Sequence, residues 1–244
     1  MLNQLKRWFT TSQKPKPPDP GDLEDWAHAR RYTVRPVHDD SGLVIEGRTG
    51  VDTWRLEWGP AQRRYVQGQE LRLRADLSFG SELQLLVISR QLQEAMESTV
   101  FEQYVEGVQT RIDDNTPPEM RWLVMFPALS GTELGPLREH FHAVGNSKSW
   151  LQQWLDGALA TSLAAMPHRN PQPMVLMIGR GRLLLRAQCN EPSRQAVDAW
   201  VKVFETALRE ARRVATQTAS ANAPSTQPSL WSANALPTSD DPVS

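Results

Sequence analysis

The chain has very little cysteine, since Cys189 is the single one among 244 residues. No disulfide can form within the chain, and nothing in the sequence indicates an oxidising compartment. A lone thiol becomes a nucleophile when a neighbouring base or positive charge lowers its pKa. No motif around Cys189 supplies such a group, so we interpret this residue as a structural thiol.

Long apolar runs are also absent. No stretch approaches the ~20 residues that a helix needs to cross a bilayer, and the first residues contain no apolar segment of the length found in signal peptides. The sequence therefore predicts a cytoplasmic protein, with the inner face of a membrane as the other place where it would act.

Neither sign of charge dominates. The chain has 27 basic and 28 acidic side chains and a net charge of −1, so no overall field would attract nucleic acid. Arg30, Arg31, Arg35, Arg63 and Arg64 could form a local patch, but nucleic-acid binders usually combine a basic face with interleaved aromatic residues. We interpret these arginines as ordinary surface residues and expect no nucleic-acid partner.

No set of residues has the spacing of a known catalytic motif, and the patterns of serine hydrolases, β-lactamases and zinc peptidases are missing. Gly179-Arg180-Gly181 follows a predicted strand, as a dinucleotide-binding loop does. The next residues, however, continue with strand periodicity and do not open a helix that could face a phosphate. We therefore predict a hairpin turn at this point, no catalytic residues and no cofactor.

The strongest metal-like pattern is the sequence Glu-His-Phe-His at residues 139–142. If this segment is helical, His140 and His142 lie on different faces and cannot chelate one ion. Glu139 and His142 would share a face, as in di-iron bundles, but such sites need a second copy and two more carboxylates. We interpret His142 as a cation near the C-terminal end of a helix and expect no bound metal.

Two further clusters of charge have simple surface explanations. Asp113, Asp114 and Glu119 fit an acidic turn better than a carboxylate site. Arg180, Arg182 and Arg186 could bind an anion together, but Arg182 and Arg186 alternate with apolar residues, so we expect them on the solvated face of a strand.

Residues 54–58 and 70–77 alternate strictly between apolar and polar side chains. Because side chains on a strand point to alternating faces, both runs indicate strands with one buried and one solvated face. That pattern is typical of an antiparallel sheet.

Other strands and helices follow from similar patterns. Strands are predicted at residues 33–37, 43–46, 53–58, 71–77, 83–89 and 121–127, and helices at about 90–110, 133–144 and 147–166. A hairpin of residues 174–178 and 182–187 and a long helix opening at Pro192 and Ser193 come last. The sequence therefore predicts an α+β fold, in which an antiparallel sheet of short strands in the N-terminal half packs with three to four helices, plus a C-terminal β-hairpin and long helix.

Both ends have a composition that does not form a core. Residues 1–25 are rich in proline, and residues 216–244 consist almost entirely of small and polar residues. Such segments bury too little apolar surface to offset their ordering entropy. We predict an amphipathic basic segment and proline-rich linker at 1–25, a single globular domain at 26–215 and a disordered polar tail at 216–244.

The candidate contact residues lie in these two ends. On a short helix, the apolar and basic residues of the N-terminal segment would form a stripe that binds an anionic membrane surface through residues 1–16, or a groove on a protein partner. A frayed terminus without a role is the alternative. The predicted contact residues are Leu2, Leu5, Lys6, Arg7, Trp8 and Phe9, with Leu230 and Trp231 as a docking anchor in the tail.

The nine tryptophans support a packed core more than a ligand pocket. Six of them fall on predicted inner faces: Trp54, Trp58, Trp122, Trp150, Trp154 and Trp200. We predict a non-enzymatic soluble adaptor or protein-interaction domain, with a small-molecule-binding domain or an enzyme without a local motif as the alternative. An enzyme should bring polar side chains together in one deep pocket, whereas an adaptor should leave an exposed apolar patch or sheet edge.

Overall fold

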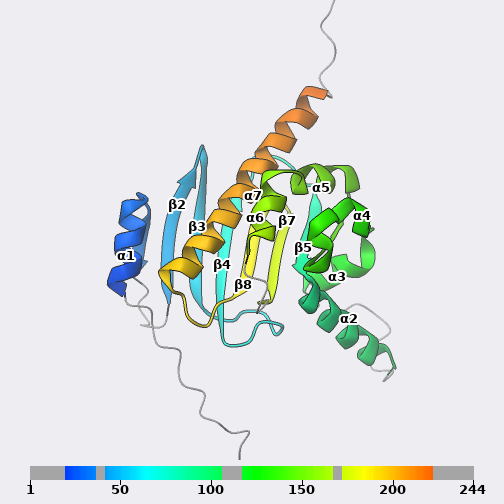
Figure 1. Cartoon of the computed structure of the whole chain (residues 1–244), viewed down its shortest axis with the longest axis horizontal. Helices are drawn as coiled ribbons and strands as arrows, with labels where there is room; N and C mark the ends of the chain where they lie inside the picture. Colours follow the sequence, from blue (N-terminus) through cyan, green and yellow to red (C-terminus); the bar gives the residue numbers. More distant parts are fainter. Residues whose placement is uncertain (1–19, 37–41, 106–116, 167–171, 222–244) are drawn as a thin grey trace, which may run out of the picture.

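The computed structural model describes residues 20–36, 42–105, 117–166 and 172–221. One antiparallel sheet of eight strands forms its centre (Figure 1). The strands are β1 (Thr33–Pro36), β2 (Leu43–Thr49), β3 (Asp52–Pro60), β4 (Gln69–Asp76), β5 (Gln84–Ser89), β6 (Phe141–Gly145), β7 (Met174–Gly179) and β8 (Arg182–Gln188). The α+β class predicted from the sequence is confirmed.

The strand order β1-β2-β3-β4-β8-β7-β5-β6 shows how two parts of the chain build one sheet. The first four strands form a meander, and the β7–β8 hairpin is inserted between β4 and β5. The hairpin turn places Arg180 at φ 53° and Gly181 at φ 68°, as the tightest antiparallel turns require. The predicted hairpin is therefore confirmed.

One face of the sheet is covered from end to end by helices (Figure 1). They are α1 (Pro20–Ala29), α5 (Lys148–Leu155), α6 (Ala158–Ala164) and α7 (Arg194–Ala221). The predicted apolar stripe of α7 is buried here, and Trp154 Nε1 on α5 donates to the Ala207 carbonyl on α7 at 2.9 Å. All six tryptophans predicted to face inward are buried, so the prediction of core packing is confirmed.

The opposite face carries the helices α2 (Arg90–Val105) and α3 (Pro118–Met125). They lie over β5 and β6 and bury a second, smaller apolar cluster. On β2, β3 and β4 this face carries charged side chains, as the alternating pattern predicted. In the part of the chain that the structure describes, no helix is long and apolar enough to cross a membrane.

The strand predicted at residues 121–127 is wrong, because residues 121–125 belong to helix α3. Pro117 and Pro118 provide the reason, since proline is favoured in the first helical turn. The apolar run arises because one side of the helix packs on the sheet through Trp122 while Val124 and Met125 remain exposed. A continuous apolar run of this length does not distinguish a helix from a central strand.

The helix predicted at residues 133–144 is also wrong. Instead, a capping box of Ser130 and Glu133 starts the one-turn helix α4 (Gly131–Leu134), which is followed by the 3₁₀ helix η2 (Gly135–Glu139) and by strand β6. Gly135 at φ 55° ends α4, because a residue in this conformation cannot continue a helix.

A glycine also divides the helix predicted at residues 147–166. Gly157 has φ 75° and separates α5 from α6. At the domain boundaries, α1 begins at Pro20 and α7 ends at Ala221, so helical residues extend past both ends of the predicted 26–215 domain. The predicted helix at 90–110 is present as α2 up to Val105, and its last residues lie outside the described part.

Candidate functional site

The predicted contact residues at the two ends, Leu2, Leu5, Lys6, Arg7, Trp8, Phe9, Leu230 and Trp231, lie outside the described residues. Among the described residues, three places in the folded domain are candidate functional sites. These are a buried ion network beside α3, the exposed side of α3 itself, and a cleft between α1 and α7.

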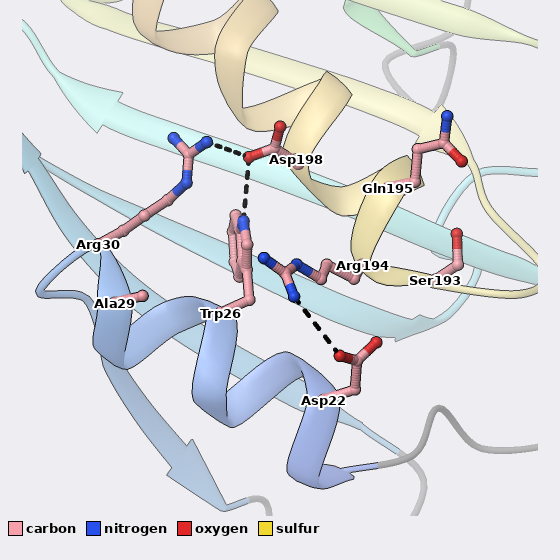
Figure 2. Close-up of a pocket in the computed structure, with 8 residues that line it drawn as sticks. All are labelled: Asp22, Trp26, Ala29, Arg30, Ser193, Arg194, Gln195 and Asp198. Carbon is pink, nitrogen blue, oxygen red and sulfur yellow. Dashed lines mark hydrogen bonds and ion pairs between the residues drawn. The ribbon is translucent and has the colours of Figure 1, made fainter.

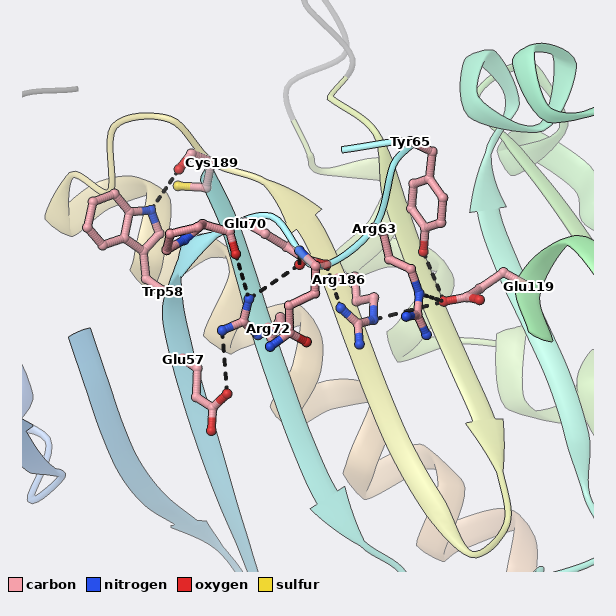
Figure 3. A network of polar contacts seen from close by, with 11 residues as sticks. Glu57, Trp58, Arg63, Tyr65, Glu70, Arg72, Glu119, Arg186 and Cys189 are labelled. Atoms are coloured by element: carbon pink, nitrogen blue, oxygen red, sulfur yellow. Dashed lines mark hydrogen bonds and ion pairs between the residues drawn. The ribbon is translucent and has the colours of Figure 1, made fainter. Parts of the chain in front are cut away.

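The ion network lies on the second face of the sheet, where β4 and β8 meet the β3–β4 loop and α3 (Figure 3). At its centre is Glu70 on β4, whose side chain is fully buried. Its carboxylate accepts hydrogen bonds from Arg186 Nη1 at 2.7 Å, from Arg72 Nη1 at 3.3 Å and from the Gln62 backbone N–H at 2.8 Å. These bonds fix the start of the loop and join two neighbouring strands.

A second buried carboxylate, Glu119, connects the network to the first turn of α3. Glu119 accepts from Tyr65 Oη at 2.9 Å and from Arg63 Nε at 3.2 Å, and Arg186 Nε lies 3.9 Å away. Burial raises the pKa of Tyr65 and the charge of Glu119 raises it further, so the phenol stays protonated and donates. The β3–β4 loop and β8 therefore both hold α3 by its N-terminal turn.

The buried charges of this network are paired with one another. Glu70 and Glu119 are contacted by the guanidinium groups of Arg63, Arg72 and Arg186, and Arg72 also lies 3.5 Å from Glu57. A buried charge is tolerated only when it is paired and hydrogen-bonded. We therefore interpret these polar side chains as a structural clamp on α3.

The network was not predicted from the sequence, and its charged members were predicted to be surface residues. Arg63, interpreted as an ordinary surface arginine, has a side chain that is only 27% exposed and pairs with Glu119. Arg186 was expected on a solvated face but is only 8% exposed, and Glu119 was expected in a surface turn but is fully buried. Both predictions are wrong because α3 covers this end of the face. The alternating pattern did place Arg72 and Arg186 on the same side of the sheet, and this is the sequence feature that could have indicated the network.

Helix α3 exposes two neighbouring apolar side chains, Val124 at 61% and Met125 at 63%. Among the described residues, the other large apolar side chain that is clearly exposed is Val51, which lies in the turn between β2 and β3. We call Val124 and Met125 the α3 ridge. The helix is anchored to the sheet, because Trp122 is 8% exposed and belongs to the second apolar cluster.

A cleft of about 460 Å³ separates α1 from the first turn of α7 (Figure 2). Asp198 accepts from Trp26 Nε1 at 3.0 Å and forms an ion pair with Arg30 at 2.5 Å, while Arg194 lies 3.8 Å from Asp22. Burial alone would raise the pKa of Asp198, but its hydrogen bonds to Lys202 and Trp26 lower it overall. The charged groups of the cleft are thus paired across it, and they attach α1 to α7.

The histidine, cysteine and acidic side chains of the described residues decide whether this part of the chain could hold a metal ion. Within the described residues, no group of three histidine, cysteine or acidic side chains could hold a metal ion. His142 lies on β6, and burial lowers its pKa, so the interpretation as a cation at a helix end is wrong. Burial raises the pKa of the Cys189 thiol to about 11, in agreement with a structural thiol.

Comparisons with known proteins do not identify a family for this chain. No family description matches the sequence, and no curated protein matches it either. Among solved structures, the chain is similar to the crystal structure of the mycobacterial trehalose monomycolate transport factor A. The two are 10% identical, the match covers 80% of this chain and 94% of that chain, and the TM-score is 0.45.

Proposed function

We propose that this protein is a non-enzymatic adaptor, a protein-interaction domain that meets its partner through the α3 ridge. The observation that carries the proposal is the exposure of Val124 and Met125, 61% and 63%, on a helix whose other side is buried. Exposed apolar surface on an otherwise well-packed domain is a common feature of docking sites.

The clamp on α3 supports this proposal. Glu119 and Trp122 hold one side of the helix through the ion network and the second apolar cluster. A ridge held in this way loses little conformational freedom on binding, so more of the contact energy appears as affinity. Methionine suits such a position, because its unbranched, polarizable side chain adapts to the surface that it meets.

The same geometry favours an adaptor over the alternative of an enzyme or a small-molecule-binding domain. The polar side chains that converge beside α3 are engaged with one another in ion pairs. Those of the cleft between α1 and α7 are paired across it. In both places the charged side chains serve to join elements of the fold.

The two ends add further proposals of the same kind. The segment with Leu2, Leu5, Lys6, Arg7, Trp8 and Phe9 would bring the domain to an anionic membrane surface or to a second protein groove. Leu230 and Trp231 would act as a docking anchor in the tail. The adaptor would then act in the cytoplasm, at the inner face of a membrane.

A pull-down that compares three forms of the full-length chain tests the role of α3. The wild type is compared with Val124→Ser/Met125→Ser and with Val51→Ser, a matched change at an exposed apolar residue far from α3 in sequence. We expect specific proteins with the wild type and Val51→Ser, and at least tenfold less of them with the α3 variant, because truncated anchors cost ~1–3 kcal/mol.

The same proteins recovered equally with all three forms would overturn the proposal. Circular dichroism and thermal unfolding of the variants should match those of the wild type, since all three changes are at exposed side chains.

A further inference from the structure

Arginine is the commonest charged residue on the part of the second face that β1, β2, β3, β4 and β8 form. We call this surface the arginine face and define it by the strand positions that point away from α7 on β1, β2, β3, β4 and β8. Among the described residues its arginines are Arg35, Arg48, Arg55, Arg72, Arg74, Arg182 and Arg186, and its carboxylates are Glu46, Glu57, Glu70 and Asp76. The whole chain has a net charge of −1, so this positive excess is local.

Two pairs of arginines lie directly opposite each other on this face. Arg72 on β4 is paired in register with Arg186 on β8, and Arg55 on β3 with Arg74 on β4. Like charges in directly opposed positions destabilise a sheet. Each pair therefore needs a carboxylate to compensate it.

The inner pair has a carboxylate of its own. Both Arg72 and Arg186 donate to Glu70, one to each carboxylate oxygen. The side chains of this pair are only 13% and 9% exposed. The protein thus contains, inside its own fold, an example of two opposed arginines that bind one carboxylate.

The outer pair lacks such a dedicated partner. Arg55 Nε lies 2.8 Å and Arg74 Nη2 lies 3.7 Å from the same oxygen, Glu57 Oε1, while the other oxygen of Glu57 lies 3.5 Å from Arg72. Arg55 also reaches Glu46 at 3.3 Å, and Glu46 is shared with Arg35. The side chains of Arg55 and Arg74 are 36% and 59% exposed.

We propose that the Arg55–Arg74 pair binds a carboxylate side chain of an acidic protein segment, in the way that Arg72 and Arg186 bind Glu70. A guanidinium group has five N–H donors arranged to match a carboxylate. Because Glu46 and Glu57 are shared with other arginines, part of the hydrogen-bonding capacity of Arg55 and Arg74 is unused. Arg35, Arg48 and Arg182 extend the positive surface to neighbouring strands, so further acidic residues of the segment would be attracted beside the first.

The inference goes beyond the proposed adaptor role of α3, because it concerns a different surface. An acidic protein segment fits this surface better than other polyanions do. Sheets that bind single-stranded nucleic acid use exposed aromatic side chains, and here Trp54 and Trp58 point to the covered face. A membrane-binding surface also needs apolar side chains to insert, and the exposed positions of this face are arginine, threonine and aspartate.

The test uses a fluorescent twelve-residue peptide that alternates glutamate with serine, and its glutamine counterpart as the uncharged control. Binding to the full-length protein is followed by fluorescence anisotropy. We expect the wild type to bind the glutamate peptide and not the glutamine one, with affinity that falls as salt increases. Arg55→Gln/Arg74→Gln should bind about tenfold more weakly, which corresponds to ~1.4 kcal/mol.

A second variant should change the affinity in the opposite direction. Glu46→Gln removes a carboxylate that competes for Arg35 and Arg55, so the glutamate peptide should bind severalfold more tightly. Two controls should bind like the wild type: Arg209→Gln, on the exposed side of α7, and Val124→Ser/Met125→Ser, which separates this surface from the α3 ridge.

The proposal is overturned if the wild type does not bind the glutamate peptide, or if Arg209→Gln weakens binding as much as Arg55→Gln/Arg74→Gln does. It is also overturned if single-stranded DNA or anionic vesicles occupy the face in preference to the peptide, because the partner would then be of another class.

Discussion

Arg186 donates a hydrogen bond to Glu70 at 2.7 Å, although 116 positions separate the two residues in the chain. Both side chains are buried, and the bond crosses from β8 to β4. It joins the C-terminal hairpin to the N-terminal meander at the point where the two parts of the sheet meet. The same arginine lies 3.9 Å from Glu119, so one guanidinium group connects the seam of the sheet to helix α3.

We predict that Glu70→Leu destabilises the protein by ~3 kcal/mol, because it leaves the buried guanidinium groups of Arg72 and Arg186 without their carboxylate. Asp76→Leu is the matched control, since Asp76 pairs with Arg182 on the same two strands but is 84% exposed; it should cost at most ~1 kcal/mol. Urea unfolding measures both. The double variant Glu70→Leu/Arg186→Met should recover part of the lost free energy of unfolding. Equal effects of Glu70→Leu and Asp76→Leu would contradict the importance of the buried pair.

A substitution in the turn between β7 and β8 should increase the stability of the protein. Arg180 occupies the left-handed region at φ 53°, where asparagine is favoured over most residues with a side chain. Arg180→Asn is expected to raise the free energy of unfolding by ~0.5–1 kcal/mol, whereas Arg180→Val should lower it, because a β-branched residue is strained there. Thermal unfolding of the two variants measures the difference, and a stabilising valine would show that the turn has another conformation.

Stability should depend on pH through Glu133. The backbone N–H of Ser130 and then Lys148 lower the pKa of Glu133 from 4.5 to about 2. Because the folded pKa lies below the unfolded one, this stabilisation is complete above pH ~4.5 and is lost as the pH falls towards 2. Glu133→Gln should therefore be less stable than the wild type at pH 6, and the difference should shrink towards pH 2. A pKa of Glu133 near 4.5 in an NMR titration would disprove the capping box.

The N-terminal segment gives a prediction that the sequence alone supports. Full-length protein should co-sediment with anionic vesicles more than a form without residues 1–13, because Trp8 and Phe9 would insert and each basic residue would add ~1 kcal/mol. Neutral vesicles provide the control. Equal sedimentation of both forms would exclude a membrane role, and a protein partner lost on the same deletion would favour the groove.

Several elements of the fold could be predicted because their patterns are local. Alternation at Trp54–Trp58 and the turn at Arg180-Gly181 each depend on a few neighbouring residues, and the structure contains both. Residues 121–127 and 133–144 could not be assigned correctly. Trp122 is buried in a helix, and it would also be buried in a central strand, so its burial pattern does not separate the two. Residues 141–145 form strand β6 because they pair with β5.

The sequence by itself determined the α+β class, the solvated charged face of β3 and β4, and the inward stripe of α7, since periodicity records which side of an element is buried. Only the tertiary structure decided which charges are buried. Glu70, Glu119 and Arg186 resemble surface residues in the sequence, and they come together only when the hairpin joins the meander and α3 closes over the seam. Burial of charge depends on partners from distant segments, and no local pattern records those partners.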